Sequence, residues 1–378
     1  MQQAAPSQRL YELDAAKFVA MLLMIVGHAL DALVRPDELD ITRLPWSLWH
    51  WWRGITAPIF LTISGMLFAL TLRRDDRGRV ERSILRRRIL RAVQVGAIGY
   101  LLVLPAHRLY DLPFVENEVW RAFFQVNILQ LVAASLTILV IFAAVFDDER
   151  VFRRAVLLGS IAIAALTPLV HRIAWYDHLP SALAAYVSYD GGSLFPVFPF
   201  SAFMLFGAWL GARLRTIEYE RLRWFRRTGI VLGGMLAVVG VTISTAVPIA
   251  GVDIYRYTPI GVAIREGVAL LFIVGVSLAL PALRAIERLL VLFGKQALTI
   301  YVLHLVLLFG SPWFSSIGRL YPKALSLGEG IAAAITILVL TLGSVVAWQH
   351  VRPYILRPAV VQALRIGVAV VLAYLLLA

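Results

Sequence analysis

The sequence contains no cysteine among its 378 residues. This absence excludes disulfide bonds, thiolate metal ligands and a cysteinyl acyl-enzyme intermediate. Charge is also scarce, because charged residues make up 16% of the chain, where a soluble domain averages about 25%. Apolar residues make up 60%, against about 45–50% in soluble domains. The composition therefore predicts an all-α polytopic integral membrane protein.

Further absences narrow the function. The spacings HExxH and HxxxH do not occur, so no metal site is predicted. A glycine-rich P-loop is missing too, which argues against a transport ATPase. The net charge of +13 comes without a basic and aromatic surface module, so we expect no nucleic-acid partner. Glu12 and Asp14 precede the first apolar run where a cleavable signal carries basic residues, so the first helix is expected to stay as a signal anchor.

A helix needs about 20 apolar residues to cross a bilayer, and eleven segments approach this length. The predicted spans are residues 12–34, 54–72, 86–106, 121–146, 152–171, 194–213, 229–250, 261–283, 289–310, 330–349 and 360–378. The fourth is long enough to include an interfacial turn. The stretch 172–193 is semi-polar and aromatic, which predicts an outer loop with a short interfacial helix. Because we detect no repeat and no soluble domain, residues 1–378 are predicted to form a single membrane domain.

The basic residues predict the orientation of these helices. If the helices alternate in direction, two thirds of the 36 lysines and arginines fall in loops on one side of the membrane. The richest of these loops is 73–91. Cytoplasmic loops carry an excess of Lys and Arg, so the N-terminus is predicted to be cytoplasmic and the C-terminus to lie outside.

Two polar residues interrupt the first predicted helix. His28 lies sixteen residues into it, about 24 Å along the axis, which places it in the outer third of the bilayer. Asp31 follows three residues later on the same face. An ionisable residue at this depth is costly and suggests function, and a carboxylate beside an imidazole orients it as a general base. The alternative is that His28 bonds a neighbouring helix while Asp31 lies in the interface.

Other polar residues fall in two more predicted helices. His304 and Tyr301 are three residues apart in the outer half of the ninth, and Asn127 and Gln130 share a face of the fourth. They are candidates for contact with a substrate. The alternative is hydrogen bonding between helices, which contributes about 0.6 kcal/mol on average.

The third predicted helix begins with RRRILR, at its cytoplasmic end. Arg88 and Arg91 lie on one face and Arg87 is adjacent, while Lys295 lies at the inner end of the ninth helix. A guanidinium group can donate two parallel hydrogen bonds to the oxygens of one phosphate, so a phosphorylated cytoplasmic ligand is one interpretation. The other is the positive-inside rule together with anionic lipid headgroups.

The opening RLYELDAAKFVAMLLMIVGHA contains Arg9, Asp14, Lys17 and His28 in order. It resembles the first helix of the bacterial relatives of heparan-α-glucosaminide N-acetyltransferase, which join the acyltransferase-3 proteins in a superfamily of transmembrane acyltransferases. Lys17 replaces the usual arginine. ITAPIFLTISGM, RRRILR, SLFPVFPFSAFMLFGAWLGARL and GKQALTIYVLHLVLL resemble later helices of the family. FFQVNILQLVAASL does so too, although Asn127 stands where glycine is common.

The resemblance implies that acetyl-CoA, or another acyl-CoA, donates from the cytoplasm to a hydroxyl or amine of a glycan acceptor on the outer side. The protein would then be a multi-pass enzyme of the bacterial cytoplasmic membrane, in contact with lipids. His28 would act in the transfer, oriented by Asp31. The resemblance implies that His304 is a second catalytic residue and that Asp14 and Lys17 lie at the inner mouth. The CoA phosphates would be bound by Arg87, Arg88, Arg91 and Lys295. The acceptor or the thioester carbonyl would be held by Asn127, Gln130 and Tyr301.

Several alternatives remain open at this point. The histidine can form an acyl-imidazole, or act as a base in a ternary complex. A transporter or flippase of a lipid or sugar also places ionisable residues at depth, usually with inverted repeats, and we detect none. A membrane protein of purely structural role is the third alternative. The acceptor, the acyl group and the oligomeric state are not specified by the sequence.

Overall fold

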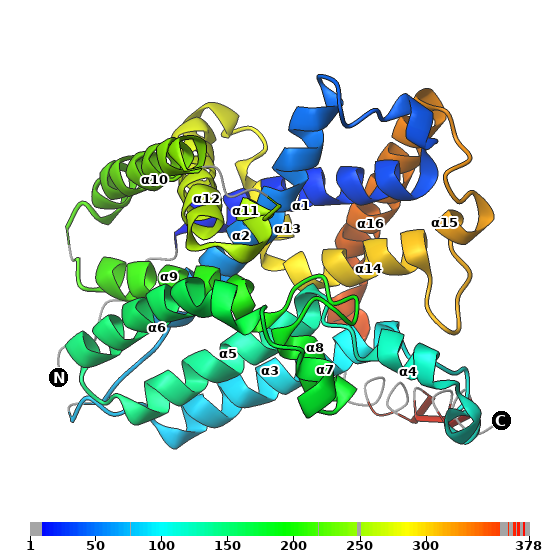
Figure 1. Ribbon diagram of the computed structural model, residues 1–378, viewed down its shortest axis with the longest axis horizontal. Coiled ribbons are helices and arrows are strands. Elements are labelled where there is room, and N and C mark those ends of the chain that lie inside the picture. Colours follow the sequence, from blue (N-terminus) through cyan, green and yellow to red (C-terminus); the bar gives the residue numbers. More distant parts are fainter. Residues whose placement is uncertain are drawn as a thin grey trace. The chain divides into compact units, whose positions relative to one another are not determined.

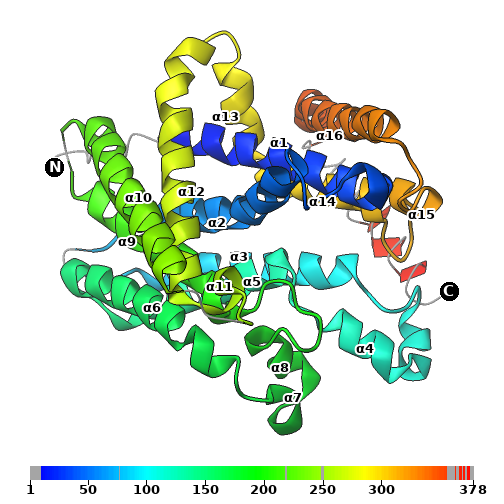
Figure 2. The same cartoon turned by 45° about the horizontal axis from the view of Figure 1, so that its top comes forward.

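The computed structural model describes residues 10–75, 77–217, 219–247 and 251–355, with a few further positions between 362 and 374. The regular elements in these residues are helices (Figures 1 and 2). They are α1 (Tyr11–Leu33), η1 (Pro36–Glu38), α2 (Trp46–Leu70), α3 (Arg82–Leu102), η2 (Leu109–Phe114), α4 (Asn117–Phe123), α5 (Ile128–Val145), α6 (Glu149–Val170), α7 (Trp175–His178), α8 (Ser181–Val187), α9 (Val197–Arg215), α10 (Arg221–Ala246), α11 (Ile254–Tyr257), α12 (Pro259–Ala279), η3 (Leu280–Leu283), α13 (Glu287–Lys295), α14 (Ala297–Phe309), α15 (Ile317–Leu320) and α16 (Leu327–Ile355).

The described helices confirm an all-α polytopic membrane protein. Eight of them are long and apolar enough to cross a membrane, or nine if α13 and α14 count as one bent span. The helix α3 is not among them, because Arg86, Arg87, Arg88 and Arg91 lower its hydropathy. Most of the segment 360–378 lies outside the described residues. The count of eleven spans and the cytoplasmic N-terminus therefore stay predictions.

Two predicted spans are divided. The segment 121–146 splits into α4 and α5, separated by residues 124–127, so the chain breaks where an interfacial turn was expected. The segment 289–310 was predicted as one helix, and this was wrong, because α13 and α14 meet at an angle of 76°. The break follows Gly294, and glycine is a poor helix former. The stretch 172–193 contains two short helices, α7 and α8, where one was expected, and its outer, interfacial location stays a prediction.

The chain groups into two compact units. The first contains Met1–Ala20, Gly54–Gly99 and Phe124–Val291, and the second contains Met21–Arg53, Tyr100–Phe123 and Leu292–Ala378. Both α1 and α2 contribute residues to each unit. The single domain predicted from the sequence stays a prediction.

In the first unit, α9 is the central helix. It packs against α5, α6 and α12, and α10 packs along α12 (Figure 1). Large apolar side chains with no exposed surface, among them Phe152 and Phe203, fill the space between these helices. Burial of this kind fixes helix positions through packing, since lipid offers no hydrophobic drive for association.

A glycine seam, formed by Gly65 of α2 with Gly207 and Gly211 of α9, holds these two helices at backbone contact. A Cβ atom at Gly207 would lie 2.0 Å from the carbonyl oxygen of Thr62, and one at Gly65 would lie 1.9 Å from that of Met204. Gly207 and Gly211 form a GxxxG motif, which permits close approach of transmembrane helices. The seam therefore positions the end of α2 and the loop that follows it.

In the second unit, α14 packs against α15 and α16. The end of α1 pairs with the segment before α16 through a short parallel bridge between Val34 and Leu325. The backbone N–H of Leu325 donates to the carbonyl of Leu33 at 2.9 Å. These bonds fix the register of α1 against the α15–α16 connection, and so fix the position of His28 about one and a half turns earlier.

Candidate functional site

A pair of histidines lies inside the second unit. The Nδ1 atom of His28 on α1 is 3.3 Å from the Nε2 atom of His304 on α14. The Nδ1 atom of His304 is 3.1 Å from the carbonyl oxygen of Ile300. His304 has no exposed surface, whereas His28 is partly exposed. The structure thus brings together two histidines that are 276 residues apart in sequence.

The hydrogen bonds assign a tautomer to each ring. A carbonyl oxygen can only accept, so Nδ1 of neutral His304 carries the proton and its Nε2 is the acceptor. Nδ1 of His28 must then donate to that acceptor. This leaves the lone pair of His28 on Nε2, with the proton positions inferred from the network. A neutral imidazole with a free, partly accessible Nε2 is equipped to act as a base or a nucleophile.

Aromatic rings surround the histidine pair. The rings of His28 and His304 stack with centroids 5.5 Å apart. Phe309 meets His28 edge-on at 5.9 Å, and Tyr301 meets His304 edge-on at 5.2 Å. Tyr301, a predicted acceptor-binding residue, therefore contacts the site by packing against His304.

Asp31 is held by a different partner from the one expected. Its carboxylate accepts hydrogen bonds from both terminal nitrogens of Arg53 on α2. Asp31 makes no hydrogen bond to His28 in the described structure. The expected contact between Asp31 and His28 is therefore not seen in the described residues, and a catalytic role for Asp31 stays a prediction. A guanidinium fork matches both carboxylate oxygens and competes better than one imidazole nitrogen. The stem of Arg53 lies against Gly27, 3.2 Å from where a Cβ would stand.

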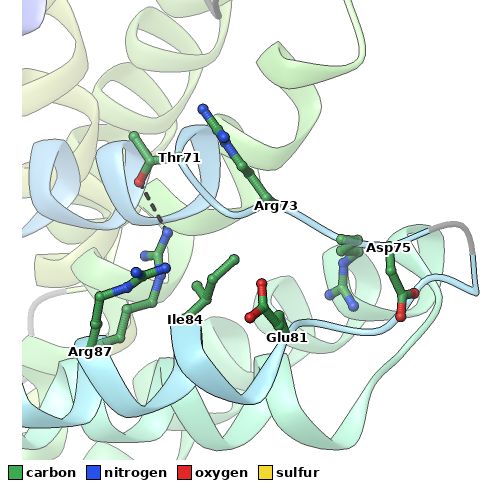
Figure 3. Close-up of a pocket in the computed structure, with 8 residues that line it drawn as sticks. Thr71, Arg73, Asp75, Glu81, Ile84 and Arg87 are labelled. Carbon is green, nitrogen blue, oxygen red and sulfur yellow. Dashed lines mark hydrogen bonds between the residues drawn. The ribbon is translucent and has the colours of Figure 1, made fainter. Parts of the chain in front are cut away.

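A second group of site residues surrounds a cavity in the first unit, between the end of α2 and the start of α3 (Figure 3). Its volume is about 520 Å³, within the range of ligand pockets. The lining residues are Thr71, Arg73, Arg74, Asp75, Glu81, Ile84, Arg87 and Arg88. Four of the eight carry guanidinium groups, so the cavity favours an anionic ligand.

Two of the four arginines are already bound to protein groups. Arg74 donates to Glu149 at 3.0 Å and to three backbone carbonyls, so it joins the α2–α3 loop to the α5–α6 connection. Arg88 donates to the carbonyl of Phe68 at 3.0 Å and to the hydroxyl of Thr71 at 3.1 Å. Its guanidinium also lies 4.2 Å from the centre of the Phe68 ring. Figure 3 shows the bond from Arg88 to Thr71.

The other two guanidinium groups are uncommitted. Arg73 and Arg87 are exposed and make no hydrogen bond or ion pair within the described residues. Arg87 was predicted to bind phosphate, and Arg73 was not. Arg91 is exposed and does not line the cavity, because it lies a full turn beyond Arg87 along α3. Lys295 is exposed at the end of α13, in the second unit.

A comparison of the sequence with protein families finds a match over more than half of the chain. A model of the family described as heparan-α-glucosaminide N-acetyltransferase, catalytic, matches residues 9–245. The chain belongs to this family. Membership implies membrane acetyltransferase activity. No curated protein matches the chain.

The match covers one of the two histidines. His28 lies within residues 9–245, whereas His304 lies beyond them. The cavity arginines Arg73 and Arg87 also lie within the matched range. The family match thus confirms the resemblance seen in the sequence, and the roles of His28, His304 and the cavity arginines stay predictions.

The remaining predicted site residues lie elsewhere in the first unit. Asn127 directly precedes α5 and does not cap it with its side chain. Gln130 is buried, and neither amide atom has a hydrogen-bond partner in the described structure. Asp14 is buried and Lys17 half-buried near the start of α1, while Arg9 lies outside the described residues. Among the described residues, no cluster of metal ligands occurs.

Proposed function

We propose that this acetyltransferase-family protein moves an acetyl group from cytoplasmic acetyl-CoA to a hydroxyl or amine of a glycan acceptor on the outer face of a bacterial cytoplasmic membrane. The single observation that carries the proposal is the hydrogen-bond chain from His28 through His304 to the Ile300 carbonyl. It leaves one accessible imidazole nitrogen with a free lone pair. Because the acceptor must lose a proton as it attacks a thioester, this nitrogen supplies the required base.

The transfer then balances as follows. Nε2 of His28 takes the proton of the acceptor hydroxyl or amine while the acceptor oxygen or nitrogen bonds to the thioester carbonyl carbon. The carbon–sulfur bond breaks when the tetrahedral intermediate collapses. The imidazolium returns the proton to the departing CoA thiolate. The Nδ1–H bond to His304 holds the ring in place through both proton movements.

The cavity arginines are assigned to the donor. Arg73 and Arg87 offer two uncommitted guanidinium forks on exposed side chains, which suits the phosphates of CoA arriving from the cytoplasm. Arg88 would act indirectly, because its donors already bind Phe68 and Thr71 and so support the cavity wall. Arg91 and Lys295 have weaker support, since neither lines the cavity.

The test is transfer of radiolabelled acetyl from acetyl-CoA to glucosamine by purified protein in lipid nanodiscs. His28→Ala is expected to lower kcat by roughly 10²- to 10⁴-fold, the usual contribution of a general base. His350→Ala is the matched control, because this exposed histidine only bonds its own helix at Val346. Full activity of His28→Ala would exclude the assignment.

A binding measurement separates failure of the site from failure of the fold. Acetyl-CoA should raise the melting temperature of the wild type and of His28→Ala alike, because ligand binding stabilises the folded state whether or not transfer occurs. A labelled protein isolated after incubation with acetyl-CoA alone would assign an acyl-imidazole intermediate, and its absence a ternary complex. Lack of any stabilisation by acetyl-CoA would favour a transporter.

A further inference from the structure

A buried arginine in the first unit lacks a counter-ion. Arg265 lies on α12 and is 8% exposed. Its Nε donates to the carbonyl of Gly261 at 3.3 Å, one turn back along the same helix. One terminal nitrogen, Nη2, is buried and has no hydrogen-bond partner in the described structure. The rings of Phe200 and Phe203 lie 5.5 and 5.8 Å from the guanidinium carbon.

In the described part of the chain, no carboxylate is in direct contact with this guanidinium. Within the described residues Arg265 forms no ion pair, and the titratable groups that act on it electrostatically are Tyr189, Asp253 and Tyr255. The charge of Asp253 acts on Arg265 without an ion pair between them, and one oxygen of its carboxylate caps α11 by accepting the Arg256 backbone N–H at 3.1 Å. An unpaired buried charge is strongly destabilising, and so is an unmet buried donor. The site therefore lacks one anionic group.

A second buried polar group points to the same place. Tyr189 is 8% exposed, and its hydroxyl has no hydrogen-bond partner in the described part of the chain. Burial raises the pKa of Tyr189 to about 12, so the phenol keeps its proton at neutral pH and remains a donor. The charge of Arg265 acts on this phenol. Tyr189 also belongs to the same buried cluster as Phe200 and Phe203, the two rings beside Arg265, so the two unmet donors lie in one region of the core.

The surroundings of Tyr189 form an aromatic and cationic wall. His171 stacks on its ring at 4.7 Å, and Tyr257 meets it edge-on at 5.5 Å. The exposed Arg256 lies over the ring face, 3.9 Å from the centroid, and also acts on the phenol oxygen. Because a guanidinium can only donate, the hydrogen of the Tyr189 O–H stays available to a ligand. The cations thus run from an exposed arginine to a buried one, an arrangement that draws anions inward.

We propose that Arg265 and Tyr189 form a binding site for an oxyanion, the carboxylate or phosphate of a small ligand, with Arg256 at its entrance. The guanidinium Nη2 and the phenol O–H each donate one hydrogen bond to the anion, and the aromatic rings contact the rest of the ligand. The two sources of such a group are a free acidic sugar and the headgroup of an anionic lipid. This site does not depend on the proposed acetyl transfer.

The test measures thermal unfolding in nanodiscs of zwitterionic lipid at constant ionic strength, with chloride as the control anion. Glucuronate and inorganic phosphate are added as free probes, and phosphatidylglycerol is incorporated as the lipid probe. At least one probe is expected to raise the melting temperature of the wild type. Tyr189→Phe keeps the packing and loses one donor to a charged acceptor, so it should weaken binding by roughly tenfold or more.

Arg265→Gln removes the charge and should abolish stabilisation by the probe. Arg226→Gln is its matched control, because Arg226 donates to the Ser277 hydroxyl at 2.9 Å and so has its own partner. Stabilisation by glucuronate or phosphate assigns a soluble ligand, and stabilisation by phosphatidylglycerol alone assigns a lipid headgroup. No stabilisation by any probe, or an equal effect on wild type and Tyr189→Phe, overturns the site. If Arg265→Gln does not fold, Tyr189→Phe decides alone.

Discussion

At the residue scale, the hydrogen bonds of His28 and His304 fix which nitrogen of each ring carries the proton. His304 is buried and gives its Nδ1–H to the Ile300 carbonyl, so only its Nε2 is left to accept from His28. It is a positioning residue in this arrangement, since it acts on the acceptor through His28. The pair therefore predicts a difference between variants that keep an acceptor at position 304 and variants that lose it.

His304→Leu removes the acceptor and should lower kcat about ten- to a hundredfold while leaving KM for acetyl-CoA unchanged, because the base loses its fixed tautomer. His304→Gln keeps an amide oxygen that can accept from Nδ1 of His28 and should retain most of the activity. Steady-state kinetics on the three proteins makes the comparison. Equal loss in both variants, together with lower melting temperatures, would reduce His304 to a packing residue.

The cavity arginines predict a different kinetic effect. Arg73→Gln and Arg87→Gln should each raise KM for acetyl-CoA by roughly tenfold or more with kcat nearly unchanged, because each removes a charged contact to donor phosphate. Arg91→Gln is the control, since Arg91 lies outside the cavity lining. A larger rise in KM for Arg91→Gln than for Arg87→Gln would contradict the cavity assignment. It would favour the phosphate site predicted from the sequence, in which Arg88 and Arg91 share a helix face.

The sequence identified some of these residues and missed others for physical reasons. His28 and His304 could be predicted because an imidazole within an apolar helix is costly wherever it points. Arg53 could not, because its ion pair with Asp31 joins two helices and leaves no local pattern. A sequence also does not show which arginines in a basic segment donate hydrogen bonds to backbone carbonyls. Arg74 does and Arg73 does not.

At the element scale, helix existence was predictable and helix breaks were not. Apolar runs long enough to span a bilayer identify helices with little regard to context. The break between α13 and α14 falls at Lys295 and Gln296, just after Gly294. A polar pair does not decide a break by itself, because Arg265 and Glu266 leave α12 unbroken, so tertiary packing matters as well. The close contact of α2 and α9 also follows from spacing, because Gly207 and Gly211 are four residues apart.

The glycine seam predicts a strong effect from one methyl group. In Gly207→Ala the new Cβ would lie 2.0 Å from the Thr62 carbonyl oxygen, so the helices must separate. Overpacking of this kind lowers the free energy of unfolding by about 1–3 kcal/mol, and the melting temperature should fall by several degrees. Gly275→Ala in α12 is the control, because nothing lies within 4 Å of its Cβ position. An unchanged melting temperature in Gly207→Ala would contradict the seam.

At the scale of the whole molecule, the absence of cysteine permits a direct test of topology. Arg77→Cys lies in the loop between α2 and α3, and Leu320→Cys lies between α14 and α16; both positions are exposed. If the N-terminus is cytoplasmic, a membrane-impermeant maleimide should label position 320 in intact cells and position 77 only after lysis. The reverse pattern would invert the topology and place the arginine cavity on the outer face.

The glycine seam also bears on how this protein can change over evolutionary time. At Gly65, Gly207 and Gly211 the neighbour is a backbone carbonyl, which no other substitution can remove. Drift at those three positions is therefore limited by volume. The exposed Arg73 and Arg87 are limited by charge, and lysine retains part of it. If the cavity binds the donor as proposed, relatives can alter donor affinity gradually there, whereas the contact between α2 and α9 admits almost no intermediate steps.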